Sequence, residues 1–268
     1  MGKQTAKTTE RSLLLINTIQ NLGGATLNEL GSELEMARST IHVHLQTLVQ
    51  NGYIVKEGET YHIGLRFLNH GEYARSRKTA YTLAKNTVNH LSEQTDEEVE
   101  FVVKNNSRGI LVHESFHPDS QFQSKEGHHS DASTAGIYYH LHSVATGKAI
   151  LAELSLESVE EVIDEWELPE QTDQTITDRE EFLDELEQIR NRGVAFADEE
   201  YIDGLREVGR RIKNPDGSVL GAIAIIGPKY RFTNERFTEE LPELLIEYVD
   251  ELEAEIEKAY FDEYLPDS

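Results

Sequence analysis

Apolar residues recur at helical spacing three times within residues 1–50. Their positions, three or four residues apart, predict three short helices. The predicted ranges are 11–20, 27–34 and 39–50. Thr9 and Thr26 are the expected N-caps of the first two helices, and Thr26 with Glu29 has the spacing of a capping box. The pattern therefore predicts two helices, a tight turn and a third helix.

Two β-prone runs follow the third predicted helix. Residues 53–56 and 60–63 flank Glu57-Gly58-Glu59, and the glycine favours a tight turn between them. A helix-turn-helix that is closed by a two-stranded hairpin is a winged helix. We therefore predict a winged helix-turn-helix domain over residues 1–64.

The third helix is expected to have an outward face almost free of acidic residues. If Ile41, Leu45 and Leu48 pack in a core, the 100° step per residue turns polar side chains outward. Such a face fits the major groove of DNA, where arginine, hydroxyl and amide groups contact phosphates and base edges. The predicted DNA contacts are Arg38, Ser39, Thr40, His42, Val43, Gln46 and, in the wing, Lys56. The alternatives are a solvated polar face, a surface role for Lys56, and a winged helix that docks protein.

Beyond residue 64 the pattern alternates between helical and extended segments. The expected helices span 65–78, 81–93, 147–154, 159–166, 180–192 and 235–260. The expected strands span 99–104, 109–114, 205–212 and 220–226. Because 220–226 is almost wholly apolar, it is expected in the centre of an antiparallel sheet. The chain is thus predicted to have an α+β fold, with helices on both sides of that sheet.

The composition excludes several kinds of protein. The chain of 268 residues has no cysteine, so it forms no disulfide, thiolate zinc site or cysteine nucleophile. It begins with no apolar signal segment and contains no run of about 18 apolar residues. We therefore expect a cytoplasmic protein that does not contact membranes.

The formal net charge of −25 is unevenly distributed. Residues 1–80 contain nine basic and seven acidic residues, whereas the other 188 contain 16 basic and 43 acidic residues. A nearly neutral, slightly basic head therefore precedes a strongly acidic body, which suggests a specialised surface on the head. The acidic body resembles proteins of salt-loving archaea; the alternative is an ordinary acidic protein from a mesophile.

Several sequence blocks, in order, resemble the IclR family of transcriptional regulators. These blocks are ERSLLLINTIQ, TLNELGSELEMARSTIHVHLQTLVQNGYI, YHIGLRFLNHG, HSVATGKAILAEL, RGVAFADEEYIDGLREVGRRI and PDGSVLGAIAIIGPKYRF. The resemblance implies a linker helix over residues 65–80 and a GAF-like α/β/α effector-binding domain with a mainly antiparallel sheet over residues 81–268. It further implies homodimers, pairing into homotetramers, that bind a palindromic site on double-stranded DNA with heads about 34 Å apart.

The sequence departs from the family pattern at informative positions. Val43 stands where the family commonly has an arginine. Where members that sense small carboxylates hold a hydrogen-bonding cysteine or serine, this chain has Glu207, Ala224 and Ile226. Since a carboxylate repels organic acids, a hydroxyl-rich effector such as a sugar or sugar derivative is expected.

The effector pocket is expected where a polar loop over residues 116–135 covers the sheet. The residues predicted to line it are Ala145, Thr146, Asp198, Glu207, Ala224 and Ile226. Effector binding there is expected to change the operator affinity of the heads.

Nothing in the sequence assembles into a catalytic site or calls for a cofactor. Thr146-Gly147-Lys148-Ala149 lacks the preceding glycine of a phosphate-binding loop. Six histidines crowd the region between two predicted strands, either as solvated loop residues or as a metal site, and the former is the expectation. They are His113, His117, His128, His129, His140 and His142. We therefore predict a regulator; the alternative is a GAF-like sensor or enzyme whose head docks protein.

Overall fold

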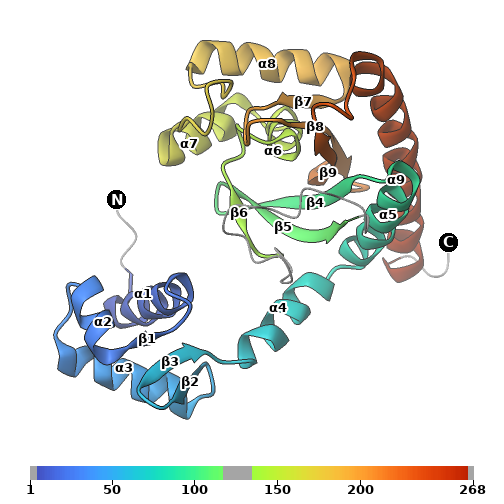
Figure 1. The fold of residues 1–268 in the computed structure, drawn as a ribbon. Coiled ribbons are helices and arrows are strands. Elements are labelled where there is room, and N and C mark those ends of the chain that lie inside the picture. Colours follow the sequence, from blue (N-terminus) through green and yellow to red (C-terminus); the bar gives the residue numbers. More distant parts are fainter. Residues whose placement is uncertain (1–4, 117–134, 265–268) are drawn as a thin grey trace. The chain divides into compact units, whose positions relative to one another are not determined.

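The computed structural model describes residues 5–116 and 135–264, and the chain separates into two compact units between residues 74 and 75. Figure 1 shows the first unit, the head, in blue and the second, the body, from green to red. Each unit has its own apolar core and is described by itself.

The head is a winged helix, as predicted. Its elements are α1 (Lys7–Asn21), β1 (Ala25–Thr26), α2 (Leu27–Glu33), α3 (Arg38–Gln50), β2 (Ile54–Glu57) and β3 (Thr60–Ile63). The antiparallel strands lie in the order β1-β3-β2, and Gly58 takes a φ of +61° in the turn of the wing. The core residues Leu15, Leu30, Ile41 and Leu45 are fully buried. Their helical spacing therefore sets the orientation of α3 on the other helices.

The two predicted caps had different outcomes. Thr26 forms the capping box, since its backbone N–H donates to Glu29 Oε2 at 2.7 Å and Glu29 N–H donates to Thr26 Oγ1 at 3.3 Å. The prediction of Thr9 as a cap was wrong: α1 begins at Lys7 with Ala6 as its N-cap. The pattern of apolar residues begins later than the helix itself. Residues 5–10 are all exposed, so no buried face sets the spacing of apolar residues in the first turn.

Helix α4 (Arg66–Ser76) follows the wing and buries none of its side chains. The ring of Tyr53 anchors its first turns, with ring centroids 5.1 Å from Phe67 and 5.6 Å from His70. The Arg66 guanidinium lies 4.9 Å from the centroid of the same ring and donates to the Asn51 carbonyl at 2.7 Å. One aromatic side chain thus ties the start of this helix to the end of α3.

The body is a three-layer α/β/α domain around a six-stranded antiparallel sheet in the order β6-β5-β4-β9-β8-β7. The strands are β4 (Glu98–Asn105), β5 (Arg108–Ser115), β6 (Tyr138–Tyr139), β7 (Ala195–Asp198), β8 (Leu205–Lys213) and β9 (Val219–Pro228). The helices are α5 (Thr79–Thr95), α6 (Ala145–Leu151), α7 (Leu156–Trp166), α8 (Arg179–Arg192), the π-helical turn η1 (Arg236–Glu240) and α9 (Leu241–Tyr264). Helices α5 and α9 cover one face of the sheet, and α6, α7 and α8 lie on the other (Figure 1). The predicted fold class and the central place of β9 are confirmed.

Three short strands and the π-helical turn were not predicted. Strands β1, β6 and β7 have two to four residues, too few for the alternation that identifies a strand. The expected helix over 235–260 begins instead as η1. The turn was not predicted because no residue pattern distinguishes the i to i+5 hydrogen bonds of a π-helix from those of an α-helix. Among the described residues, no helix combines the length and the apolar character that crossing a membrane requires.

Candidate functional site

Helix α3 presents a continuous exposed face on the head. Ile41, Leu45 and Leu48 are buried as predicted, so the intervening side chains point outward. The predicted contacts Arg38, Ser39, His42, Val43 and Gln46 are exposed, and Thr40 is half-buried. The side chain of Val43 is 60% exposed, although it is apolar. This face contains no acidic residue that would repel a phosphate.

Two basic residues of the head have partners within the chain. The Arg38 guanidinium donates to Asn28 Oδ1 on α2, which joins the start of α3 to the preceding helix. Lys56 lies in β2, exposed, with its ammonium 3.8 Å from a carboxylate oxygen of Glu59 and 5.4 Å from the ring centroid of Tyr61. Because exposed ion pairs are weak, Lys56 stays available to a phosphate.

A second candidate site lies on the face of the sheet that α6 covers. In the strand register, Ile226 of β9 is paired with Glu98 of β4 on one side and with Glu207 of β8 on the other. In the next row that points to this face, Ala224 is paired with Glu100. Paired residues of neighbouring strands point to the same face, so three glutamates converge around two apolar residues.

Burial and mutual repulsion keep these carboxyl groups from ionising readily. The Glu207 side chain is buried and accepts a hydrogen bond from Ala145 N–H at 2.7 Å. Burial, and to a smaller extent the charge of Glu100, raises the pKa of Glu207 to about 8. Burial also raises the pKa of Glu98 and of Glu100, whose Oε1 accepts from the hydroxyl of Tyr139 at 2.9 Å. At neutral pH the site therefore holds carboxyl groups that both donate and accept hydrogen bonds.

The structure brings four of the six predicted pocket residues together. Ala145, Glu207, Ala224 and Ile226 lie on the α6 side of the sheet. Thr146 is buried one residue into α6. Asp198 is paired with Arg206, the neighbour of Glu207, so it points to the other face. There the Arg206 guanidinium binds both of its carboxylate oxygens, at 2.7 and 2.9 Å.

Sequence reasoning missed Glu98, Glu100 and Tyr139 in this site. The two glutamates alternate with apolar residues in β4, which is a detectable signal for one face of a strand. That signal does not say which strand lies beside β4, and only the β4-β9-β8 order brings Glu98 opposite Glu207.

Lys148 is a buried ionic residue rather than part of a phosphate-binding loop. Its side chain is 1% exposed, and its ammonium donates to Glu200 Oε1 at 2.6 Å. A Glu185 carboxylate oxygen lies 3.8 Å away. The contact with Glu185 joins α6 to α8, and the contact with Glu200 joins α6 to the segment after β7.

The expected histidine cluster is partly described. His113 is buried with its ring stacked 6.3 Å from that of Phe101, and the rings of His140 and His142 lie 5.9 Å apart. His117, His128 and His129 lie outside the described residues, as does the predicted loop over 116–135 except for its two ends. Within residues 5–116 and 135–264, no three histidine or acidic side chains are placed to hold a metal ion.

The substitution Glu207→Gln tests the site through the pH dependence of stability. Because the pKa of Glu207 is about 8 in the folded state and near 4.5 when unfolded, the folded state binds more protons between these values. The free energy of unfolding therefore falls as the pH rises through this range. Glutamine does not ionise, and its carbonyl can still accept from Ala145. At about pH 8 the variant should be more stable than the wild type by on the order of 3 kcal/mol.

Urea denaturation at about pH 5 and about pH 8 measures this difference. The gain should fall below about 1 kcal/mol at the lower pH, where Glu207 is protonated in the folded wild type. Glu257→Gln, at an exposed position of α9, is the control and should change neither curve. An equal gain at both pH values would contradict the assignment of a protonated Glu207.

A winged helix-turn-helix joined to a three-layer domain with an enclosed polar site defines a class of DNA-binding regulators with a ligand-sensing domain. The sequence profile of the IclR helix-turn-helix domain matches residues 8–58, and that of the bacterial transcriptional regulator IclR C-terminal domain matches residues 72–254. The chain therefore belongs to the IclR family of transcriptional regulators, which are not enzymes.

Known proteins are similar over nearly the whole chain. The "Probable HTH-type transcriptional regulator ArcR" of Halobacterium salinarum is 32% identical over 246 residues, which is 91% of this chain and 92% of that protein. The crystal structure of Thermotoga maritima IclR superposes with a TM-score of 0.72 at 25% identity, covering 93% of this chain and 98% of that one. The inducer-binding domain of Acinetobacter PobR, solved with 3-hydroxybenzoic acid, has the same fold as the body, with a TM-score of 0.56 at 24% identity. The match to this PobR domain, a double mutant, covers 63% of this chain and 95% of the PobR chain.

Proposed function

We propose that this regulator binds a palindromic operator as a dimer or tetramer in the cytoplasm, and that a small molecule bound by the body modulates its operator affinity. The observation that carries the proposal is the exposed, acid-free face of α3 on a winged helix of the IclR family. The two-fold symmetry of a dimer would match that of the operator, with the heads about one helical turn apart. The proposal also includes the domain boundaries: a DNA-binding domain over residues 1–64, a linker helix over 65–80 and an effector-binding domain over 81–268.

Each residue of the α3 face has a specific role in the proposed complex. Arg38, Ser39 and Thr40 lie in the first turn of the helix, where side chains and free N–H groups suit phosphates or base edges. Gln46 offers an amide to a base edge, and Val43 offers an apolar surface to a thymine methyl group. His42 and, from the wing, Lys56 would contact the flanking backbone.

The combined substitution Arg38→Ala and Thr40→Ala should abolish the specific shift of DNA from the gene's own upstream region in a mobility assay. It removes a charged and a hydroxyl group from the proposed interface, and a hydrogen bond to a charged group such as a phosphate contributes about 1.5–3 kcal/mol. Lys104→Ala, which removes a positive charge from an exposed position of the body, is the control and should shift DNA like the wild type. Unaltered binding by the double variant, with its fold intact by circular dichroism, would count against α3 as the reading helix.

The proposed effector is a hydroxyl-rich molecule such as a sugar or sugar derivative. Three glutamates on one sheet face disfavour an anion, whereas carboxyl groups that both donate and accept hydrogen bonds suit hydroxyl groups. Binding would act by population shift: the effector would favour one spacing of the paired heads, and the spacing that fits the operator binds tightly.

Calorimetric titration of the full chain with a panel of neutral sugars and sugar acids tests the effector class. We expect heat from at least one neutral sugar and a loss of that heat in Glu100→Ala, which removes a carboxyl group from the site. Glu257→Ala serves as the matched control on the surface of α9. Binding by acids alone would overturn the assignment.

A further inference from the structure

Three residues on the α7 side of the body each bury a nitrogen atom without a hydrogen-bond partner. The atoms are Arg108 Nε, His140 Nδ1 and Trp166 Nε1, and each is unpaired within the part of the chain that the structure describes. A buried polar atom without a partner costs about 1–3 kcal/mol, and few occur in a folded protein. Their occurrence on neighbouring side chains therefore indicates a site for a group from outside the chain.

The three side chains form one contiguous cluster. The Arg108 guanidinium, from the first residue of β5, lies 5.0 Å from the centroid of the Trp166 ring. The ring of His140 meets the same indole edge to face, with centroids 6.2 Å apart and planes at 79°. Arg108 also donates through Nη2 to the carbonyl of Tyr138 at 3.0 Å, which fixes its position. The last residue of α7 thus lies between the arginine and the histidine.

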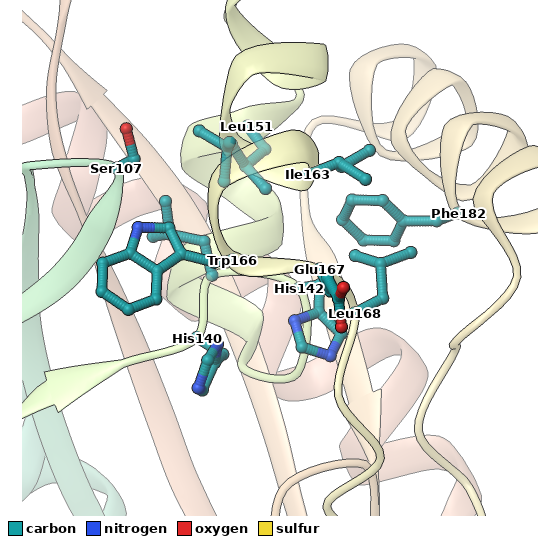
Figure 2. Close-up of a pocket in the computed structure, with 11 residues that line it drawn as sticks. Ser107, His140, His142, Leu151, Ile163, Trp166, Glu167, Leu168 and Phe182 are labelled. Carbon is teal, nitrogen blue, oxygen red and sulfur yellow. The ribbon is translucent and has the colours of Figure 1, made fainter. Parts of the chain in front are cut away.

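A small hollow opens beside this cluster. Figure 2 shows Trp166 between Ser107 and His140. These three residues line a pocket whose space, including the part open to solvent, is about 250 Å³. Arg108 does not line this pocket, but its guanidinium packs on the Trp166 ring. The enclosed part admits about one water molecule, so its occupant is small. His142, on the same wall, already has a partner, because its Nε2 lies 3.0 Å from the Pro169 carbonyl.

The chemistry of the three nitrogen atoms selects a negatively charged acceptor. Arg108 Nε and Trp166 Nε1 carry hydrogen atoms and act only as donors, and the guanidinium is permanently charged. Burial, followed by the charge of Arg108, lowers the pKa of His140, which favours the neutral form of the ring. The Nδ1 atom of a histidine ring can carry a proton and act as a third donor. Among the described residues that line the pocket, the one acidic residue is Glu167, whose side chain is exposed and thus screened by solvent.

We propose that His140 and Trp166, with the Arg108 guanidinium packed on the indole, form a binding site for one small anion of the size of chloride. The site uses none of the residues assigned to DNA or to the glutamate site on the sheet, and it does not depend on the proposed function.

Trp166 is the only tryptophan of the chain, so its fluorescence reports on this site directly. The full-length protein is titrated with chloride in one series and bromide in another, with sulfate, an ion too large for the enclosed space, keeping the ionic strength constant. We expect a saturable change in emission with at least one anion. Arg108→Gln should weaken that binding about tenfold or more, because it removes the positive charge that lies beside the site.

Lys104→Gln is the matched control, because it removes the same charge from an exposed position near Arg108, on the paired strand β4. It should leave the anion affinity unchanged. The absence of saturation with both anions, or an equal loss of affinity in both variants, would overturn the site. If Arg108→Gln does not fold, crystals of the wild type soaked in bromide decide the matter: an anomalous peak next to Trp166 Nε1 supports the site, and its absence overturns it.

Discussion

Gly147→Ala is expected to destabilise the body by more than about 3 kcal/mol, beyond the usual effect of one added methyl group. A Cβ atom at this position of α6 would lie 2.1 Å from the Leu141 carbonyl oxygen and 2.5 Å from the Leu141 Cα. Both contacts are with backbone, so no change of side-chain rotamer relieves them. Helix α6 would have to move away from the segment before it, which would loosen the hydrogen bond from Ala145 to Glu207.

Urea denaturation followed by Trp166 fluorescence measures this loss within the same unit. Gly71→Ala provides the matched control, because Gly71 also lies inside a helix but no heavy atom comes within 4 Å of an added Cβ. Because Gly71 lies in the first unit, the control should leave the urea midpoint that Trp166 reports for the body unchanged. Equal midpoints for Gly147→Ala and the wild type would show that α6 does not pack as described.

Lys148→Met should lower the free energy of unfolding by about 3–5 kcal/mol, the usual result of removing one partner of a buried ion pair. Methionine nearly preserves the volume, so the loss comes from the charge of Glu200, which is left buried without its ammonium partner. Burial already raises the pKa of Glu200 and Lys148 opposes that shift, so the variant would raise it further. Stability of the variant should therefore fall more steeply than that of the wild type as the pH rises above about 5.

The double variant Lys148→Met with Glu200→Gln separates charge from packing. Removing the unpaired carboxylate should recover more than half of the loss, as a double-mutant cycle by urea denaturation would measure. If the double variant were as unstable as Lys148→Met alone, the loss would arise from packing of the side chain and not from the ion pair.

The helices of the chain follow from its sequence because each buries one regular face. In α3 the spacing of Ile41, Leu45 and Leu48 defined both the buried and the exposed side. In α8 the Asp178 carboxylate caps the first turn, and Gly193 ends the helix in the left-handed conformation. Short segments behave differently, since the position of β7 is set by hydrogen bonds to β8 rather than by its own four residues.

The two sites of the body depend on contacts that a sequence does not specify. Glu207 was predicted from family resemblance. Its repulsion by Glu98 arises because β4 and β8 both pair with β9, which brings the two side chains to the same face of the sheet. Arg108, His140 and Trp166 come from three segments with no common motif, and their unpaired nitrogen atoms appear only when those segments are packed together. Sites of this kind are formed by the packing of distant segments and are not visible in the sequence.

The sparse packing of α4 has a thermal consequence. Isolated helices shorter than about 12–15 residues are marginal in water, and α4 has 11 residues, a central glycine and no buried side chain. Tyr53 holds its beginning, whereas Leu68 and Tyr73 remain more than half exposed. On warming, the turns after Gly71 should unwind before either core melts, and their amide hydrogens should exchange first; a second copy that covered Leu68 and Tyr73 would delay both.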